Sequence, residues 1–197
     1  MIYNALIVGV GGQGVLLASR VIGEAAMKAG HEVVMSEVHG MAQRGGSVSA
    51  AVRFGEGVIS PLIPKAGADL IIGFEPVETY RALPYAKRGT VVVTDVGRLV
   101  PMTVTSGGEK YPEVGDLLSS MEGAGLKVVS LDATKLAEDA GTRLTVNSVL
   151  IGAVSALAGF PLPEDVLGST LLSSVPGKAK DVNEKAFALG RRAVLGR

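Results

Sequence analysis

The six residues GVGGQG, Gly9 to Gly14, constrain the fold more than any other stretch of the chain. They stand between an apolar run at 3–8 and a segment at 13–29 whose apolar residues recur at helical spacing, and a further apolar run follows at 32–36. Gly9, Gly11 and Gly14 match a fingerprint in which glycines permit a tight turn, close approach of backbone to a phosphate, and close packing of helix on strand. The order predicts a strand, a glycine loop, a helix and a second strand joined by a right-handed parallel crossover.

Three interpretations of this loop stay open on these residues. It is a dinucleotide site if Glu37, 23 residues after Gly14, is the acid that binds a ribose. It is a site for another phosphate or pyrophosphate if the free N–H groups of the helix N-terminus hold an anion. It is otherwise a turn without a ligand. Gly12 and Gln13 make the loop more open than the fingerprint requires, and we expect Gln13 to face the anion pocket.

A second glycine cluster lies within residues 36–50. The pattern of this segment is neither a clean helix nor a clean strand, which indicates a functional loop. Arg44 precedes Gly45-Gly46, so a bidentate donor stands beside accessible backbone amides, an arrangement that suits phosphate, carboxylate or pyrophosphate. His39 and Gln43 belong to the same cluster, and His39 is a candidate for proton transfer or for orienting a ligand.

The rest of the chain alternates strand-like and helix-like segments. Two strand-like segments flank the turn signal Gly55-Glu56-Gly57 and predict a hairpin, 47–54 with 58–63. Buried strands are expected at 68–74, 90–95 and 126–131, and helices at 76–85, 113–122, 132–140, 146–158, 163–173 and 179–194. This order predicts an α/β fold: a Rossmann-like, doubly wound, mostly parallel sheet with a β-hairpin insertion and a C-terminal helical segment, in a single domain over 1–197.

Three further polar residues are candidates for a substrate site or an interface. Glu75 follows a buried strand, where ligands of α/β folds collect, although a helix N-terminal acid is an equal interpretation. Arg53, on the predicted hairpin, is expected to pair with Glu75 or to face solvent. Asn147 is most simply a helix cap. It opens a helix at 145–159 that is apolar around nearly its whole circumference, so this helix must be covered within the chain or by a partner.

The absence of cysteine limits the chemistry of the chain. Thiolates can hold no iron–sulfur cluster here, and the only two histidines, His31 and His39, are not at metal-ligand spacing. We therefore predict no metal site and, since no nucleophile elbow is present, no catalytic residue in this chain. Equal numbers of basic and acidic residues, 19 each, give no indication of nucleic acid or of a membrane surface. The N-terminus shows no export signal, and a cytoplasmic protein is expected.

Several motifs, taken in order, resemble the gamma-type subunit of 2-oxoacid:ferredoxin oxidoreductases. They are GVGGQG at 9–14, SEVHGMAQRGGSVSAAVRFG at 36–55, SPLIP at 60–64, ADLIIGFEPVETYRAL at 68–83 and an Asn-x-x-Leu-x-Gly element at 147–152. Within that family, HGMAQRGG and GFEP are most similar to the beta subunit of indolepyruvate:ferredoxin oxidoreductase. The resemblance spans nearly the full chain, although no motif matches within 96–125.

The resemblance implies a Rossmann-like domain beside a larger subunit that carries thiamine diphosphate, magnesium and iron–sulfur clusters. The implied reaction is the coenzyme A-dependent oxidative decarboxylation of an aryl 2-oxoacid to an aryl-acetyl-CoA, with reduction of ferredoxin. This chain would hold none of these cofactors alone, and it would form a wall of the active-site cleft. We hypothesise that the glycine loop and Arg44-Gly45-Gly46 lie near the subunit interface or coenzyme A. The alternatives are an NAD(P)- or nucleotide-binding oxidoreductase, a subunit of another 2-oxoacid:ferredoxin oxidoreductase, and a protein that only docks.

Overall fold

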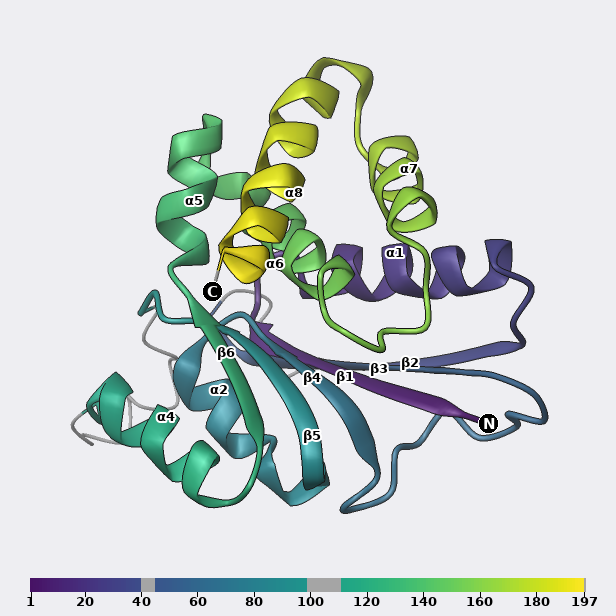
Figure 1. Ribbon diagram of the computed structural model, residues 1–197, viewed down its shortest axis with the longest axis vertical. Helices are drawn as coiled ribbons and strands as arrows, with labels where there is room; N and C mark the ends of the chain where they lie inside the picture. The colour runs from purple at the N-terminus through teal and green to yellow at the C-terminus, as the bar shows by residue number, and fades with distance from the viewer. Residues whose placement is uncertain (40–44, 99–110, 197) are drawn as a thin grey trace.

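A six-stranded sheet in the order β2-β3-β1-β4-β5-β6 forms the centre of the computed structural model, which describes residues 1–39, 45–98 and 111–196 (Figure 1). The strands are β1 (Tyr3–Val10), β2 (Val33–His39), β3 (Ser47–Phe54), β4 (Ala68–Gly73), β5 (Ala86–Asp95) and β6 (Lys127–Leu131). β1, β4, β5 and β6 are parallel, whereas β3 runs antiparallel to both β1 and β2. The prediction of a mostly parallel α/β sheet is confirmed.

Helices cover both faces of the sheet, as the doubly wound prediction requires. They are α1 (Val15–Lys28), α2 (Pro76–Arg81), α4 (Val114–Gly123), α5 (Ala133–Ala140), α6 (Val146–Ser155), α7 (Glu164–Ser174) and α8 (Lys180–Leu195). Figure 1 shows α1 and α5 to α8 on one face of the sheet, and α2 and α4 on the other. None of the helices in the described ranges has the length and apolar character needed to cross a membrane.

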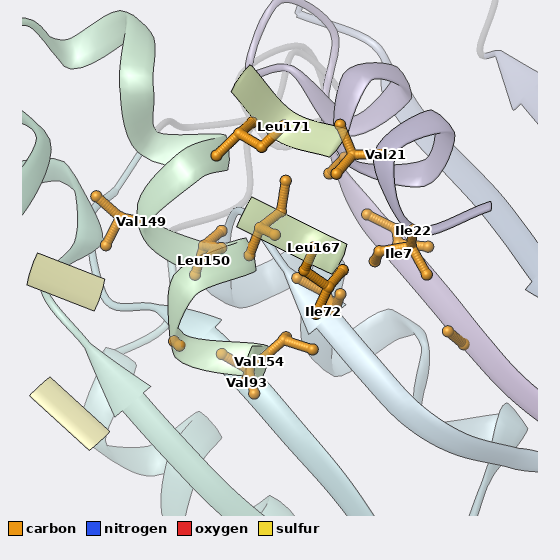
Figure 2. Close-up of a cluster of buried hydrophobic side chains, with 14 of the residues drawn as sticks. Ile7, Val21, Ile22, Ile72, Val93, Val149, Leu150, Val154, Leu167 and Leu171 are labelled. Carbon is orange, nitrogen blue, oxygen red and sulfur yellow. The ribbon is translucent and has the colours of Figure 1, made fainter. Parts of the chain in front are cut away.

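The larger core lies between the sheet and helices α1, α6 and α7. Central strands of a parallel sheet are buried on both faces, which explains why their sequences are continuous apolar runs rather than alternating ones. Figure 2 shows side chains from β1, β4 and β5 and from the three helices that meet there: Ile7, Ile72, Val93, Val21, Ile22, Val149, Leu150, Val154, Leu167 and Leu171. This core holds the carboxyl ends of β1, β4 and β5 at one edge, where the candidate site lies.

Helix α6 is covered within the chain. Every residue from Val146 to Val154 is buried, and α8 crosses α6 in close backbone contact. A methyl group at Gly152 would lie 2.0 Å from the carbonyl oxygen of Phe187, and one at Gly190 would lie 1.9 Å from that of Val149. The two glycines thus allow the helices to approach without intervening side chains. Cover by a partner subunit, the other interpretation of this apolar helix, is not needed.

Two predictions are wrong, the hairpin of 47–54 with 58–63 and the assignment of Glu37 and His39 to a loop. Residues 58–63 form no strand, because both edges of β3 are already hydrogen-bonded, one to β1 and the other to β2. The predicted hairpin is replaced by a β2–β3 hairpin, and Glu37 and His39 lie in a strand rather than in a loop. In addition, β2 does not neighbour β1, since β3 is inserted between them. The crossover through α1 therefore skips one strand.

Candidate functional site

The glycine loop joins the carboxyl end of β1 to the N-terminus of α1. Gly12 and Gly14 have φ angles of 101° and 90°, a region in which residues with a side chain are strained. Gly9 is needed for a different reason, because a methyl group there would lie 2.7 Å from Cβ of Phe74 at the end of β4. Gly14 precedes α1 without a side-chain cap, and the first turn of α1 holds no acidic residue. Among the described residues, therefore, neither a capping side chain nor an acid of the first turn occupies the N–H groups of this helix N-terminus.

We expected Gln13 to face an anion pocket, but both polar atoms of its amide are hydrogen-bonded within the protein. Its Oε1 accepts a hydrogen bond from Val10 N at 2.7 Å, and its Nε2 donates to the carbonyl oxygen of Phe74 at 2.8 Å. The amide thus ties the loop to the adjacent strand end. Gln13 still lines a neighbouring pocket, but its polar atoms stabilise the loop conformation.

The two glycine clusters lie together. Gly11 N donates to the carbonyl oxygen of Gly46 at 2.8 Å, and Gly45 has a φ of 79°. Gln43 and Arg44 lie outside the described residues, and of His39 only the backbone is described, in register with Val48 of β3. The structure thus brings Gly45-Gly46 to the glycine loop.

Glu37 lies on β2, the edge strand, with an exposed side chain. In a dinucleotide-binding domain the strand that carries the ribose-binding acid neighbours the first strand. Here β3 separates the two, which places β2 about 9.5 Å from β1, twice the usual spacing between strands. The dinucleotide interpretation therefore loses the acid on which it depended.

Glu75 is a buried helix cap. Its Oε2 accepts from the backbone N of Glu78 at 2.9 Å, which caps α2, and its other oxygen accepts a hydrogen bond from the Tyr111 hydroxyl. Burial raises the pKa of this carboxyl above its ordinary value, although the hydrogen bonds from Tyr111 and Glu78 oppose the shift. Of the two interpretations of Glu75, the helix N-terminal acid is the one observed.

Arg53 does not pair with Glu75. Its Nε donates to Oδ1 of Asn4 at 2.7 Å, and its Nη1 donates to the carbonyl oxygens of Ser60 at 2.6 Å and Leu62 at 3.0 Å. This side chain fastens the segment after β3 to strands β1 and β3. It lies on β3, and the bonds it makes are structural.

Asn147 is not a helix cap, because Thr145 occupies the N-cap position of α6, without a side-chain hydrogen bond, and Asn147 lies within the first turn. Its side chain is only 3% exposed, and among the described residues its Oδ1 has no hydrogen-bond partner. It packs against the glycine loop, since a methyl group at Gly14 would lie 3.3 Å from Cβ and Cγ of Asn147. The structure thus brings Asn147 to the site while leaving its amide oxygen unsatisfied.

Asp95 is a residue of this edge that the sequence analysis missed. It ends β5, and its carboxylate accepts hydrogen bonds from Gly97 N at 3.0 Å, Ala133 N at 2.9 Å and Thr134 Oγ1 at 2.8 Å. A buried internal carboxylate thus fills the N-terminus of α5. The sequence carried a signal for it, because Asp95 is the last residue of a buried parallel strand, at the same edge of the sheet as Glu75.

Two pockets flank the glycine loop. One has a volume of about 460 Å³, and its described lining is apolar apart from backbone: Val10, Gly11, Gly12, Gly14, Val15, Leu16 and Val48. The other has a volume of about 250 Å³ and includes Arg98 and Arg143. Within residues 1–39, 45–98 and 111–196, no three His, Asp or Glu side chains are grouped so as to hold a metal ion.

A family model described as pyruvate ferredoxin/flavodoxin oxidoreductase matches residues 4–193. The chain belongs to this family. It is 46% identical over 192 residues to the indolepyruvate oxidoreductase subunit IorB of Thermococcus kodakarensis, covering 97% of this chain and 95% of that protein. It is 28% identical to the 2-oxoglutarate synthase subunit KorC of Methanothermobacter thermautotrophicus, covering 96% and 93%. These relatives confirm the resemblance to 2-oxoacid:ferredoxin oxidoreductases that the motifs indicated.

A solved structure has the same fold. It is the gamma subunit of a keto/oxoacid ferredoxin oxidoreductase from Geobacter sulfurreducens, with a TM-score of 0.72 at 24% identity over 99% of both chains. Nearly the whole chain thus shares its α/β fold with that solved subunit.

Proposed function

We propose that this chain is the cofactor-free subunit of an indolepyruvate:ferredoxin oxidoreductase, acting on aryl 2-oxoacids. The observation that carries the proposal is the difference in identity, 46% to an indolepyruvate oxidoreductase subunit against 28% to a 2-oxoglutarate synthase subunit, each over nearly the whole chain. In the proposed reaction an aryl 2-oxoacid loses carbon dioxide, two electrons reach ferredoxin, and the acyl group passes to coenzyme A.

A larger partner subunit would hold thiamine diphosphate, magnesium and the iron–sulfur clusters. Since this chain has no cysteine, its side chains do not suit an iron–sulfur cluster held by thiolates. Thiamine diphosphate, held by the partner, would supply the nucleophilic carbon that decarboxylation of a 2-oxoacid requires. This chain would bind and orient the 2-oxoacid on one side of the active-site cleft, and it would exclude water from that side.

The glycine loop and Gly45-Gly46 would form that wall. The loop presents the uncapped N-terminus of α1, which favours an anionic group. Beside it, the 460 Å³ pocket has no charged side chain among its described lining residues, so it suits apolar groups of the partner or of the substrate. Arg44 and Gln43 lie outside the described residues, and we keep them as candidates for this function because they directly precede Gly45-Gly46 in the chain.

Substrate preference of the reconstituted complex tests the proposal. Ferredoxin reduction is measured with indolepyruvate, phenylpyruvate and 2-oxoglutarate, each with coenzyme A. We expect kcat/KM for indolepyruvate to exceed that for 2-oxoglutarate by roughly 100-fold or more, because a site built for an apolar ring leaves the second carboxylate of 2-oxoglutarate without a partner. A complex that prefers 2-oxoglutarate would assign the chain to another 2-oxoacid oxidoreductase.

A further inference from the structure

A groove between α7 and α8 is a cavity that the proposed function does not use. Its volume is about 540 Å³, within the range of about 300–1,000 Å³ that is typical of small-molecule sites. It lies in the helical layer on one face of the sheet (Figure 1), and it shares no described lining residue with the two pockets beside the glycine loop. The lining residues that matter here are Asp165, Gly168, Glu184, Phe187, Arg191 and Arg192.

The floor of the groove is apolar and aromatic. Leu171 and Phe187 are buried there, and Gly168 of α7 lies beside the Phe187 ring. A methyl group at Gly168 would lie 3.7 Å from Cε1 and Cζ of Phe187, which is ordinary van der Waals contact, so alanine would fit. Glycine inside a helix is less favourable than alanine. Neither close packing nor a left-handed φ requires it here. Its effect is to leave space against the ring, where a second aromatic ring could pack.

Charges of both signs meet at one end of the groove. Arg191 Nη2 lies 2.6 Å from Glu164 Oε2, which joins the C-terminal part of α8 to the first turn of α7. Arg192 and Asp165 directly follow these two residues and also line the groove, and neither forms an ion pair within the described residues. Arg191 Nε is a buried donor that has no hydrogen-bond partner among the described residues. This end therefore offers guanidinium donors to a carboxylate and an acid to an ammonium group.

The spacing along α8 fixes how far the ring lies from these charges. Phe187 precedes Arg191 by four residues, which is about 6 Å along a helix. Glu184 lies about 10 Å from Arg191 along the same axis, and within the described residues it forms no ion pair. A carboxylate there can accept a hydrogen bond from a ring N–H. The groove thus matches a molecule with both charges at one end and an aromatic ring about one helical turn away.

We propose that this groove binds an aromatic amino acid. Its carboxylate accepts hydrogen bonds from Arg191 and Arg192, and its ammonium group donates to Asp165. The ring packs on Phe187 in the space beside Gly168. An aryl acid without the ammonium group fits less well, because its carboxylate would lie near that of Asp165 with no positive charge of its own to compensate. Occupation of this groove is independent of the substrate proposed for the complex.

L-Tryptophan is the probe, because the chain contains no tryptophan and the fluorescence anisotropy of the added amino acid therefore reports its binding. The full chain should bind it saturably with a Kd below about 1 mM. L-Alanine, which has the same charges and no ring, should not displace it. Gly168→Leu fills the space beside Phe187 and should raise the Kd by roughly 10-fold or more. Gly115→Leu is the matched control, since Gly115 is a helix residue with no atom within 4 Å of an added methyl group.

Arg192→Gln tests the charged end of the groove. It should raise the Kd for L-tryptophan by roughly 10-fold and leave that for tryptamine, which has no carboxylate, within about twofold of the wild type. Arg20→Gln, on the exposed side of α1, is the control for charge and should change neither.

Two results would overturn the site. One is the absence of saturable binding to the wild-type chain, and the other is an equal Kd for wild type, Gly168→Leu and Gly115→Leu. Loss of assembly with the larger subunit in Gly168→Leu alone would assign the groove to a protein partner instead, and would also overturn it. Circular dichroism of each variant confirms that it is folded. A failed indolepyruvate assay beside intact tryptophan binding would contradict only the proposed function.

Discussion

At the scale of single residues, backbone requirements were predictable and side-chain directions were not. Gly9, Gly12 and Gly14 are where a tight turn and close strand contact need them. The directions of Gln13 and Asn147, by contrast, depend on Phe74 and Gly14, which local patterns do not bring together. Spacing along the chain therefore located the loop correctly but misassigned the two amides beside it.

Glu75 allows a prediction about pH. Burial raises its pKa in the folded protein, so the folded state binds a proton more tightly than the unfolded chain does. The stabilising effect of that proton is complete below pH 4.5, the ordinary value for glutamate, and is lost as the pH rises through the higher folded pKa. Replacing Glu75 with Gln should remove this loss, which has a maximum slope of about 1.4 kcal/mol per pH unit.

The free energy of unfolding, measured in denaturant from pH 4 to 8, checks this expectation. Wild-type and Glu75→Gln curves should converge toward low pH and separate as the pH rises, with the variant losing less stability. The exposed Glu56, replaced by Gln, serves as the control and should follow the wild type. Parallel curves for wild type and Glu75→Gln would show that this carboxyl does not titrate differently on folding.

At the scale of elements, the sequence pattern predicted the alternation of strands and helices correctly, but it did not predict which strands pair. Each buried run became a strand, because apolar residues without polar interruption fit a sheet covered on both faces. The position of β3 between β1 and β2 depends on contacts between distant segments. Residues 58–63 carry strand-like residues, but Pro61 has no N–H to donate to a ladder, and β3 had no free edge to offer.

The contact between α6 and α8 predicts that alanine in place of glycine destabilises the protein here, although helix propensity alone favours alanine. Alanine at Gly152 or Gly190 would place a methyl group within 2.0 Å or 1.9 Å of a backbone carbonyl oxygen on the facing helix. Since backbone cannot rotate away as a side chain does, the helices must separate. We expect each substitution to lower the free energy of unfolding by roughly 1–3 kcal/mol or more.

Gly115→Ala in α4 is the matched control, because a methyl group there meets no atom within 4 Å. It should be neutral or stabilise the chain by about 0.5–1 kcal/mol, as alanine usually does in a helix. The free energy of unfolding of the three variants, measured in denaturant, tests this prediction. Gly152→Ala and Gly190→Ala variants as stable as Gly115→Ala would mean that the two helices do not touch as described.

At the scale of the whole molecule, the motifs located the family and the fold located the site, but neither local pattern nor family membership indicated the basic pocket that includes Arg98 and Arg143. Arg98 and Arg143 are far apart in the chain and belong to no motif, and they line the same pocket because β5 ends, and α6 begins, at the same edge of the sheet. The alternative of a protein that only docks was based on the apolar helix at 145–159. That helix, α6, is already buried by α8 and its neighbours, so it no longer supports this alternative. What remains is a subunit that presents a glycine loop, an apolar pocket and a basic pocket side by side.

The most direct test of this account is reconstitution from separately purified subunits. Coenzyme A-dependent reduction of ferredoxin by indolepyruvate is measured with the larger subunit alone, with this chain alone and with both. The account predicts no turnover from either subunit alone and full activity when the two are combined in stoichiometric amounts. Full activity of the larger subunit without this chain, or of this chain without the larger subunit, would contradict it.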